Sequence, residues 1–284
     1  MKLQLRSLLH FHRTFALPTM ALAAAIFGPS AFASGGIIIQ GVHTPYVINS
    51  SGSYILGSNL TVNVGGAIVI TAPNVTLDLG GFMISCTGCS GSHGILVEAS
   101  GATITNGTVT GFMGSNSYGI MFQNGTNPIY GKVDHVTVMQ NGNGIGGSTA
   151  SELTVIESNA SNNTTVGIFG PGTLTVINSK VANNTQDGIF MANGLVTGCT
   201  INGNGLGGSA IRAGINVSGA ATVTNNIISY NAMWGLGSSN SNAVAVGYGL
   251  NTFYGNGAAG DVPTPPQFSG FTSMKNNVSS AGVF

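Results

Sequence analysis

LTVIESNASNNTTVGIFG, residues 153–170, is followed closely by LTVINSKVANNTQDGIFM, residues 174–191. With a shift of 21 positions, eleven of the eighteen residues are identical. A period of this length is typical of repeat architectures, in which a single unit cannot bury its own hydrophobic face and must stack on its neighbours. The repeat is therefore the feature from which the fold can be predicted.

Two markers extend the repeat beyond the doubled stretch. A Gly-Ile pair recurs at intervals of 21–25 residues, and an Asn stands shortly before it. The pairs are Gly94-Ile95, Gly119-Ile120, Gly144-Ile145, Gly167-Ile168 and Gly188-Ile189, with Ala210-Ile211 and Gly235-Leu236 as variants. The Asn residues are Asn141, Asn163, Asn184, Asn204, Asn231 and Asn256. Short apolar alternations, such as Val155 with Ala160, separate the markers and are typical of strands with one buried face.

Units of 21–25 residues fit three short strands and three turns. They are too short for a propeller blade, they lack the apolar face of a helical repeat, and their leucines are too sparse for a leucine-rich repeat. The sequence therefore predicts an all-β fold, a parallel β-helix in which each unit is one coil. With a strand spacing of about 4.8 Å, roughly nine coils make a rod of about 40 Å. Asn is expected at left-handed turns and in hydrogen-bonded stacks.

The charge pattern excludes one class of function. Only 5% of the 284 residues are charged. After residue 33 the chain has four basic residues, Lys132, Lys180, Arg212 and Lys275, against seven acidic ones, a net charge of 4 − 7 = −3. Nucleic-acid binding depends on clustered Lys and Arg side chains that displace counterions. No nucleic-acid partner is therefore expected.

The ends of the chain predict four segments. Residues 1–33 combine Lys2, Arg6 and Arg13 with an apolar run and a small-x-small pattern, Ala31-Phe32-Ala33, which indicates a signal peptide. Residues 34–59 are expected to be an N-terminal cap, 60–260 the β-helix, and the proline-containing residues 261–284 a C-terminal tail or cap. The protein is accordingly expected to be secreted, periplasmic or on the cell surface, without membrane insertion after removal of the signal.

The three cysteines predict a disulfide and no metal site. Cys86 and Cys89 form a lone C-x-x-C, and two further zinc ligands at a matching spacing are missing. In an oxidising compartment a small disulfide loop is the expected outcome. Cys199 occupies a repeat position and is expected to be a buried small residue. No cofactor is indicated.

Further motifs resemble those of a known family. Residues 74–81, NVTLDLGG, resemble the NVTLDLNG entry coil of exported bacterial right-handed parallel β-helix repeat proteins, which have the pectate-lyase-like fold. Thr103-Ile-Thr-Asn106-Gly107 is similar to the turn that follows it in that group, and Asn251 to Asn256 is similar to a closing repeat. Gly80 stands where the group usually has Asn. The resemblance covers about residues 50–260 and implies a right-handed coil, while the fold itself carries many activities.

The enzymes of this superfamily mostly act on acidic polysaccharides, but their motifs are missing here. The sequence has no Asp-Asp, Gly-His-Gly or Arg-x-Lys. One constellation remains: Asp134 and Glu157 both fall ten residues before a Gly-Ile pair, so we expect them one rung apart. Paired carboxylates at that range suit glycoside hydrolysis. Lys180, two rungs away from Asp134, would instead neutralise them, and an ordinary solvated polar row is the third interpretation.

Aromatic residues supply the remaining signal. Phe169 and Phe190 repeat in register and are expected to pack together. Exposed rings beside polar groups bind sugars, so Tyr230 and Trp234 join His135 and Lys180 as candidate binding residues. The sequence favours a scaffold that contacts polysaccharide or another surface partner without a recognisable catalytic site. The alternatives are a polysaccharide lyase or glycoside hydrolase acting through Asp134 and Glu157, and a purely structural or adhesin-like module.

Overall fold

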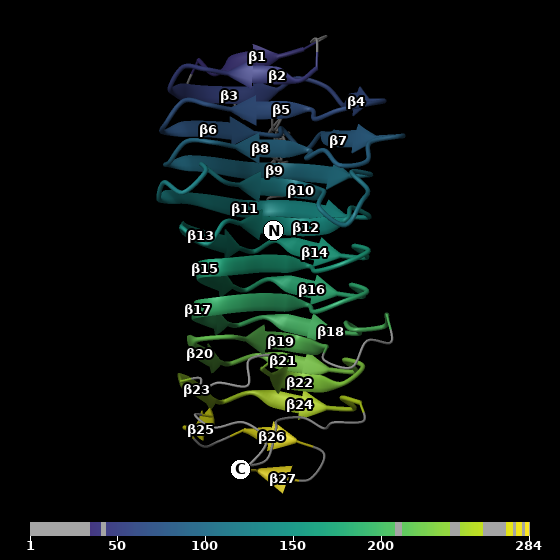
Figure 1. Cartoon of the computed structure of the whole chain (residues 1–284), viewed down its shortest axis with the longest axis vertical. Coiled ribbons are helices and arrows are strands. Elements are labelled where there is room, and N and C mark those ends of the chain that lie inside the picture. Colours follow the sequence, from purple (N-terminus) through teal and green to yellow (C-terminus); the bar gives the residue numbers. More distant parts are fainter. Residues whose placement is uncertain are drawn as a thin grey trace, which may run out of the picture. The chain divides into compact units, whose positions relative to one another are not determined.

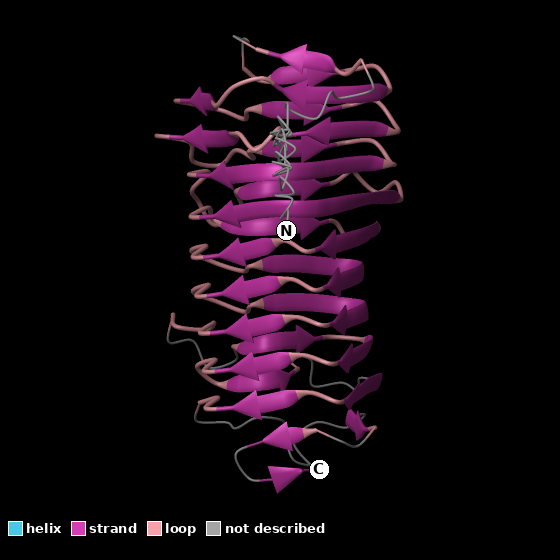
Figure 2. Cartoon of the chain, turned by 180° about the vertical axis from the view of Figure 1, so that it is seen from behind, coloured by secondary structure: helices cyan, strands magenta, loops and turns pink. Residues whose placement is uncertain are grey.

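The computed structural model describes residues 35–40, 44–207, 212–238, 245–257, 271–274, 277–279 and 282–283. The expected signal peptide, residues 1–33, lies outside them. The described residues form no helix, and their strands lie above one another in successive rungs (Figures 1 and 2). All strand pairs are parallel except the last one. The prediction of a parallel β-helix of about nine coils is confirmed.

Each coil contributes strands to three faces, which we call A, B and C in the order in which the chain meets them. Face A contains β1 (Ile37–Ile39), β3 (Gly52–Leu56), β6 (Val75–Asp78), the first parts of β9 (Ala102–Thr110) and β11 (Ile129–Met139), β13 (Ser151–Ile156), the second parts of β15 (Ile168–Ile177) and β17 (Ile189–Thr197), β20 (Ala220–Thr224), β23 (Ala245–Gly249) and β25 (Phe271–Ser273).

Face B contains β4 (Leu60–Val62), β7 (Met83–Cys86), the second parts of β9 and β11, β14 (Asn159–Ser161), β16 (Lys180–Ala182), β18 (Thr200–Asn202), β21 (Ile227–Ser229), β24 (Thr252–Tyr254) and β26 (Val278–Ser279). Face C contains β2 (Tyr46–Ile48), β5 (Ile68–Ile70), β8 (Ile95–Val97), β10 (Tyr118–Phe122), β12 (Asn143–Gly147), the first parts of β15 and β17, β19 (Ala213–Val217) and β22 (Trp234–Gly237). β27 (Gly282–Val283) pairs antiparallel with β26.

Parallel pairing begins earlier than the boundary expected at residue 60. β1 already pairs with β3, and β2 pairs with β5. Ile39 and Ile48 are fully buried in these strands, and Tyr46 packs partly against the same core. These strands therefore belong to the same stack as the repeats. At the other end β25 continues the stack on face A, while residues 261–270 lie outside the described part of the chain.

The core is a set of columns in which equivalent apolar residues lie above one another. The register places Leu153 on Leu174, Val155 on Val176 and Ile168 on Ile189, which are the pairs that the doubled sequence aligned. All six side chains are buried. Burying apolar surface in this way supplies the main stabilisation of a narrow solenoid, at roughly 25 cal/mol per Å².

A ladder of buried Asn side chains follows the bend between faces B and C. In Asn141, Asn163, Asn184, Asn204 and Asn231, each backbone N–H donates to Oδ1 of the next Asn in the series, over 3.0–3.1 Å. The side-chain amides also donate along the row. The predicted Asn stack is therefore confirmed, and it satisfies buried polar groups that would otherwise be costly.

A second ladder, which the sequence did not suggest, follows the bend between faces A and B. Its side chains accept a backbone N–H from the preceding rung and are Ser158, Ser179, Cys199, Asn226, Asn251 and Asn277. Cys199 is buried, as expected. Its thiol also accepts the Ser179 N–H and donates to the Thr197 carbonyl, so it takes part in the second ladder. Burial raises the pKa of the Cys199 thiol to about 11, which keeps it protonated and unreactive.

A left-handed residue marks the bend between faces A and B in most of the described coils. Asn106, His135, Glu157, Asn178, Asn225 and Leu250 have φ between 46° and 58°. Gly198, with φ 69°, holds the equivalent position in its own coil. This single-residue bend turns the chain from face A to face B. A left-handed residue is costly for most side chains and easiest for Gly and Asn, which explains much of the composition.

Candidate functional site

Charged residues meet where face A bends into face B. Nζ of Lys132 lies 2.8 Å from Oδ2 of Asp134, and Nδ1 of His135 lies 2.6 Å from Oδ1 of the same carboxylate. The other ring nitrogen of His135, Nε2, lies 2.6 Å from Oε2 of Glu157 on the next coil. The structure therefore brings together three predicted site residues, Asp134, His135 and Glu157, and adds Lys132. We call these four residues the bend cluster.

The register within the bend cluster differs from the sequence-based prediction. Asp134 lies beside Ile156, so that His135, not Asp134, occupies the position equivalent to Glu157. The prediction that Asp134 and Glu157 are stacked was therefore wrong by one residue. The coil of His135 has a shorter turn between its ladder Asn and its Gly-Ile pair, Asn141 to Gly144, than the next coil has, Asn163 to Gly167. Counting back across this turn shifted the alignment.

The electrostatics of the bend cluster favour an ionised Asp134. The hydrogen bond from Lys132 is the main cause that lowers the pKa of Asp134, with His135 adding to it and partial burial opposing it. The cation beside Asp134 is Lys132, whereas one of the three sequence-based interpretations assigned that role to Lys180. The imidazole of His135 stands between the two carboxylates, in the space that a scissile glycosidic bond would need. The cluster thus links two coils through an exposed network.

The remaining predicted binding residues lie on other surfaces. Lys180 points outward from β16 on face B, and the described residues form no ion pair with it. Tyr230 is 61% exposed at the bend between faces B and C. Its ring makes an edge-to-face contact with that of Tyr254, with 5.1 Å between the ring centroids. Trp234 begins β22 on face C and is only 9% exposed. These three side chains therefore do not form one site with the bend cluster.

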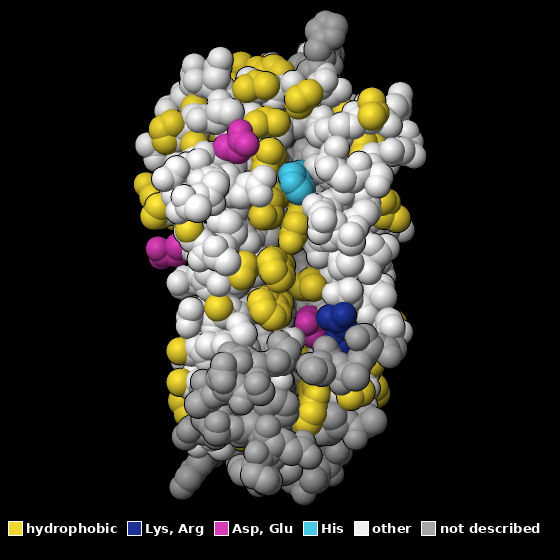
Figure 3. Space-filling model, viewed as in Figure 1, with side chains coloured by type: hydrophobic (Ala, Val, Ile, Leu, Met, Phe, Trp, Pro, Cys, Tyr) yellow, Lys and Arg dark blue, Asp and Glu magenta, His cyan; other side chains and the backbone are white. Residues whose placement is uncertain are grey.

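A row of rings runs along face C from coil to coil. The centroids of His93 and Tyr118 lie 5.7 Å apart, those of Tyr118 and Phe169 6.4 Å, and those of Phe169 and Phe190 5.1 Å. The rings of Phe169 and Phe190 are stacked, which confirms their predicted packing. Figure 3 shows the result: hydrophobic side chains form a stripe along the middle of this view, between polar margins.

Tyr118 closes a gap in this ring row. The coil between Tyr118 and Phe169 contributes Gly146, which has no side chain to continue the row. The ring of Tyr118 lies across this glycine, because a Cβ on Gly146 would come within 2.3 Å of Cε1 of Tyr118. His93 is held by a hydrogen bond from the Tyr118 N–H to its Nδ1, and burial lowers its pKa. The ring row is thus continuous, partly exposed and uncharged.

An acid–base pair lies beside the Phe190 end of the ring row. Asp187 is only 2% exposed, and its two oxygens accept the Ala213 N–H (2.7 Å) and the Asn216 side-chain amide (3.0 Å). Nη1 of Arg212 lies 3.8 Å from Oδ2 of Asp187, close enough for an ionic attraction but too far for a hydrogen bond. Burial raises the pKa of Asp187, while the two hydrogen bonds and Arg212 oppose that rise.

The pairing of Asp187 with Arg212 was missed because the repeat was misaligned at this point. The sequence pattern assigned Ala210-Ile211 to the series of Gly-Ile pairs, and those two residues lie outside the described part of the chain. Ile215, not Ile211, pairs with Ile189, so that Gly214-Ile215 is the true member of the series. With that pair, Arg212 and Asp187 both fall just before a Gly-Ile, which is a signal that the sequence did contain.

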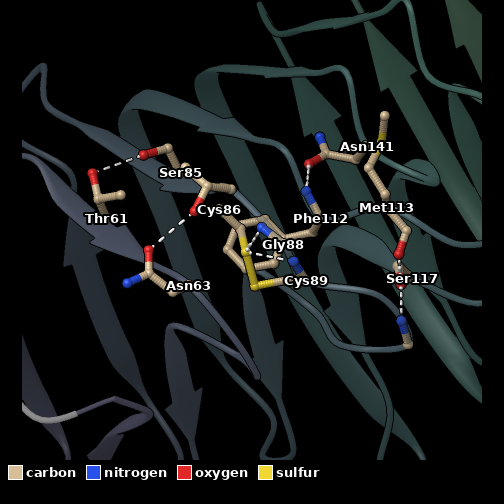
Figure 4. The surroundings of a disulfide bond; sticks show 12 residues. Thr61, Asn63, Ser85, Cys86, Gly88, Cys89, Phe112, Met113, Ser117 and Asn141 are labelled. Atoms are coloured by element: carbon tan, nitrogen blue, oxygen red, sulfur yellow. Dashed lines mark hydrogen bonds between the residues drawn. A yellow bond between two sulfur atoms is a disulfide. The ribbon is translucent and has the colours of Figure 1, made fainter.

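The expected disulfide is present at the bend between faces B and C. Cys86 and Cys89 are joined in the loop after β7, and Phe112 is drawn beside them (Figure 4). The Cys86 sulfur also accepts the N–H groups of Gly88 and Cys89. Within the described residues, no three or more His, Cys, Asp or Glu side chains are arranged to hold a metal ion. The same part of the chain contains no helix of the length and hydrophobicity that a membrane crossing requires.

Comparison with known proteins agrees with this architecture. The family model described as "Right handed beta helix region" matches residues 93–259, more than half of the chain. Among solved structures, pectate lyase Pel9A superposes with a TM-score of 0.50 and 20% identity, over 82% of this chain and 66% of that chain. At this identity the likeness shows the fold alone. No curated protein matches the sequence. The chain belongs to the right-handed β-helix family.

Proposed function

We propose that this protein is an exported scaffold that binds polysaccharide along face C. The observation that carries the proposal is the continuous ring row formed by His93, Tyr118, Phe169 and Phe190. Sugar rings present apolar C–H faces, which can lie against the apolar surface that these rings form, and aromatic side chains bury much area at a low entropic cost. Successive coils rise by about 4.8 Å, so the row offers a regular series of contacts to an extended chain.

One polar group beside the ring row is open to a sugar hydroxyl. The guanidinium of Arg212 lies at the Phe190 end with 23% of its side chain exposed, next to the buried Asp187. Ligand sites commonly combine an apolar surface with a few fixed polar groups that set orientation. The likeness to a pectate lyase adds a structural precedent for a polysaccharide ligand on a β-helix.

Binding is preferred over cleavage because the bend cluster does not offer a clear catalytic pair. The carboxylates of Asp134 and Glu157 are both engaged by His135. A lyase or hydrolase acting through them remains the second candidate, and the exposed meeting of Lys132 with three titratable groups is the observation that favours it. Release of products from acidic and neutral glycans by the wild type, lost in Asp134→Asn and Glu157→Gln, would establish that activity instead.

The binding proposal is tested by removing rings from face C. Affinity electrophoresis through gels that contain acidic or neutral polysaccharides should show retardation of the wild type. The double variant Phe169→Ala/Phe190→Ala should bind about fivefold to a hundredfold more weakly, since each lost ring contact is worth about 0.5–1.5 kcal/mol. Tyr230→Ala is the matched control, because it removes an exposed ring from another surface. Equal retardation of all three proteins, or none, would refute the proposal.

A further inference from the structure

A second recognition surface lies at the corner where face C returns to face A. Tyr130 begins the exposed part of β11, and its partner in the next coil is Glu152 of β13. Thr173 and Asn193 follow in the same register on β15 and β17. All four side chains point outward, and Tyr130 is 55% exposed. We call this row the corner row.

The corner row borders two adjoining hollows. One has a volume of about 340 Å³ and is lined by Pro128, Pro171, Thr173 and Asn193 together with Tyr130 and Glu152. The other, of about 340 Å³, lies on the face A side and includes Thr103, Lys132 and Thr154. Tyr130 and Glu152 belong to both hollows. A ligand in either one would contact a tyrosine ring and a carboxylate.

The charges of the two hollows differ. Lys132 lines only the face A hollow, and its ammonium group is already paired with Asp134 at 2.8 Å. The hollow between the prolines has Glu152 as its single charged lining residue. Within the described residues no Lys, Arg or His forms an ion pair with Glu152. This hollow therefore presents the Glu152 carboxylate, which has no ion-pair partner among the described residues, beside the side chain of Tyr130.

We propose that the hollow between Pro128 and Pro171 binds an organic ammonium group. A cation over the Tyr130 ring is attracted by the ring quadrupole, and the Glu152 carboxylate adds a direct ionic attraction. The proline rings supply apolar contact for the alkyl or ring carbons that carry the nitrogen. The same arrangement repels carboxylates and gives a neutral alcohol only the apolar contact. The site lies on a different corner from the ring row, so it does not depend on polysaccharide binding to face C.

The test compares choline with its uncharged isostere, 3,3-dimethylbutan-1-ol. Both are titrated into the full protein at low ionic strength, and binding is followed by NMR chemical-shift changes. Choline should bind about tenfold more tightly than the neutral alcohol, because only choline gains the ring and carboxylate attractions. Glucosamine and N-acetylglucosamine form a second charged and uncharged pair, which distinguishes a primary ammonium on a sugar from a quaternary one. Equal binding within both pairs would overturn the proposal.

Substitutions locate the site. Glu152→Gln and Tyr130→Ala should each weaken choline binding roughly two- to fivefold, the effect expected of a partly exposed charge pair or cation–π contact. Glu157→Gln is the matched control, because it removes the charge of another exposed carboxylate on the same coil, beyond the other end of β13 from Glu152. Circular dichroism checks that each variant is folded. If Glu157→Gln weakened choline binding as much as Glu152→Gln, the effect would be one of net charge and the assigned hollow would be wrong.

Discussion

Asp134 and Asp187 belong to the same solenoid, and their surroundings shift their pKa values in opposite directions. Asp134 lies on face A with 21% of its side chain exposed, and the hydrogen bond from Lys132 is the first cause of its lowered pKa. Asp187 is buried beside face C, and loss of hydration raises its pKa. Both carboxylates have a basic neighbour, at 2.8 Å for Asp134 and 3.8 Å for Asp187.

The difference shows that the same β-helix accommodates an exposed carboxylate and a buried one by different interactions. On face A a carboxylate can be added at a solvated bend, where water and a nearby lysine keep it ionised at little cost. Beside face C the carboxylate must replace its lost hydration with protein donors, and it does so through the Ala213 N–H and the Asn216 amide. Asp187 is thus a buried, hydrogen-bonded part of the fold next to the ring row, while Asp134 is a partly exposed surface residue.

The largest expected effect follows from removing each carboxylate in turn. Asp187→Ala should lower the free energy of unfolding by about 1–3 kcal/mol, because it leaves the buried Ala213 N–H without its acceptor. Asp134→Ala should lower it by less than about 1 kcal/mol, the range of exposed ion pairs. Chemical denaturation of both variants beside the wild type measures the two values. If Asp134→Ala lowered the free energy of unfolding more than Asp187→Ala, the buried carboxylate would not be the more important of the two for stability.

The pH dependence of stability should separate the two carboxylates by sign. A raised folded-state pKa means that the contribution of Asp187 is fully present below its unfolded pKa and is lost as the pH rises through the folded pKa. A lowered pKa means that the contribution of Asp134 is present above its unfolded pKa, about 3.9, and is lost as the pH falls through the folded pKa. Relative to Asp187→Asn, the wild type should therefore lose stability as the pH rises.

The same comparison with Asp134→Asn should run in the other direction, with the wild type gaining relative stability as the pH rises. Thermal unfolding of the three proteins between about pH 2.5 and 7 gives both differences. Parallel curves for the two variants would show that the environments of the two carboxylates do not differ as described.

The smallest effect is expected at the bend itself. Glu157 has φ 46°, a left-handed conformation that costs a side-chain-bearing residue about 1–2 kcal/mol. Glu157→Gly relieves this cost, but it removes the exposed contact with His135 and adds the chain entropy of glycine. These terms nearly cancel, so the free energy of unfolding should change by less than about 0.5 kcal/mol. Gly198 already holds the equivalent bend in another coil. A loss as large as that of Asp187→Ala would make the bend cluster a structural element.

Much of the fold could be predicted from the sequence because equivalent positions in successive coils have the same surroundings and therefore recur as the same residues. The columns through Val155 and Val176 and the ladder through Asn163 and Asn184 repeat in every central coil, so their spacing is visible. The bend cluster was placed one residue out of register because the turn after the ladder Asn varies in length. Counting six residues back from Asn141, Asn163 and Asn184 gives His135, Glu157 and Asn178, which is the register of the structure.

The rest of the candidate site depends on contacts between coils that the period reveals only when every coil is aligned correctly. Asp187 and Arg212 are 25 positions apart, and their proximity follows only when Gly214-Ile215, not Ala210-Ile211, is taken as the equivalent of Gly188-Ile189. The second ladder could not be predicted from the sequence, because Ser179, Cys199 and Asn226 are different residue types. Each of them nevertheless accepts a backbone N–H from the preceding coil. A pattern of identities cannot show an equivalence of hydrogen-bonding roles.

The hydrogen-bonded ladders make the length of this molecule an adjustable quantity. Through Oδ1 each ladder Asn accepts the N–H of the Asn in the coil before it, and it donates its own N–H to the Asn in the coil after it, so neighbouring coils are interchangeable at their junctions. A tandem duplication of one coil would create no new kind of interface, and the doubled stretch at 153–191 has the form that such an event would leave. Excision of residues 157–177 would join Ile156 to Asn178 in phase, as the register requires. The length of faces A, B and C can therefore grow or shrink in whole-coil steps without redesign of the core.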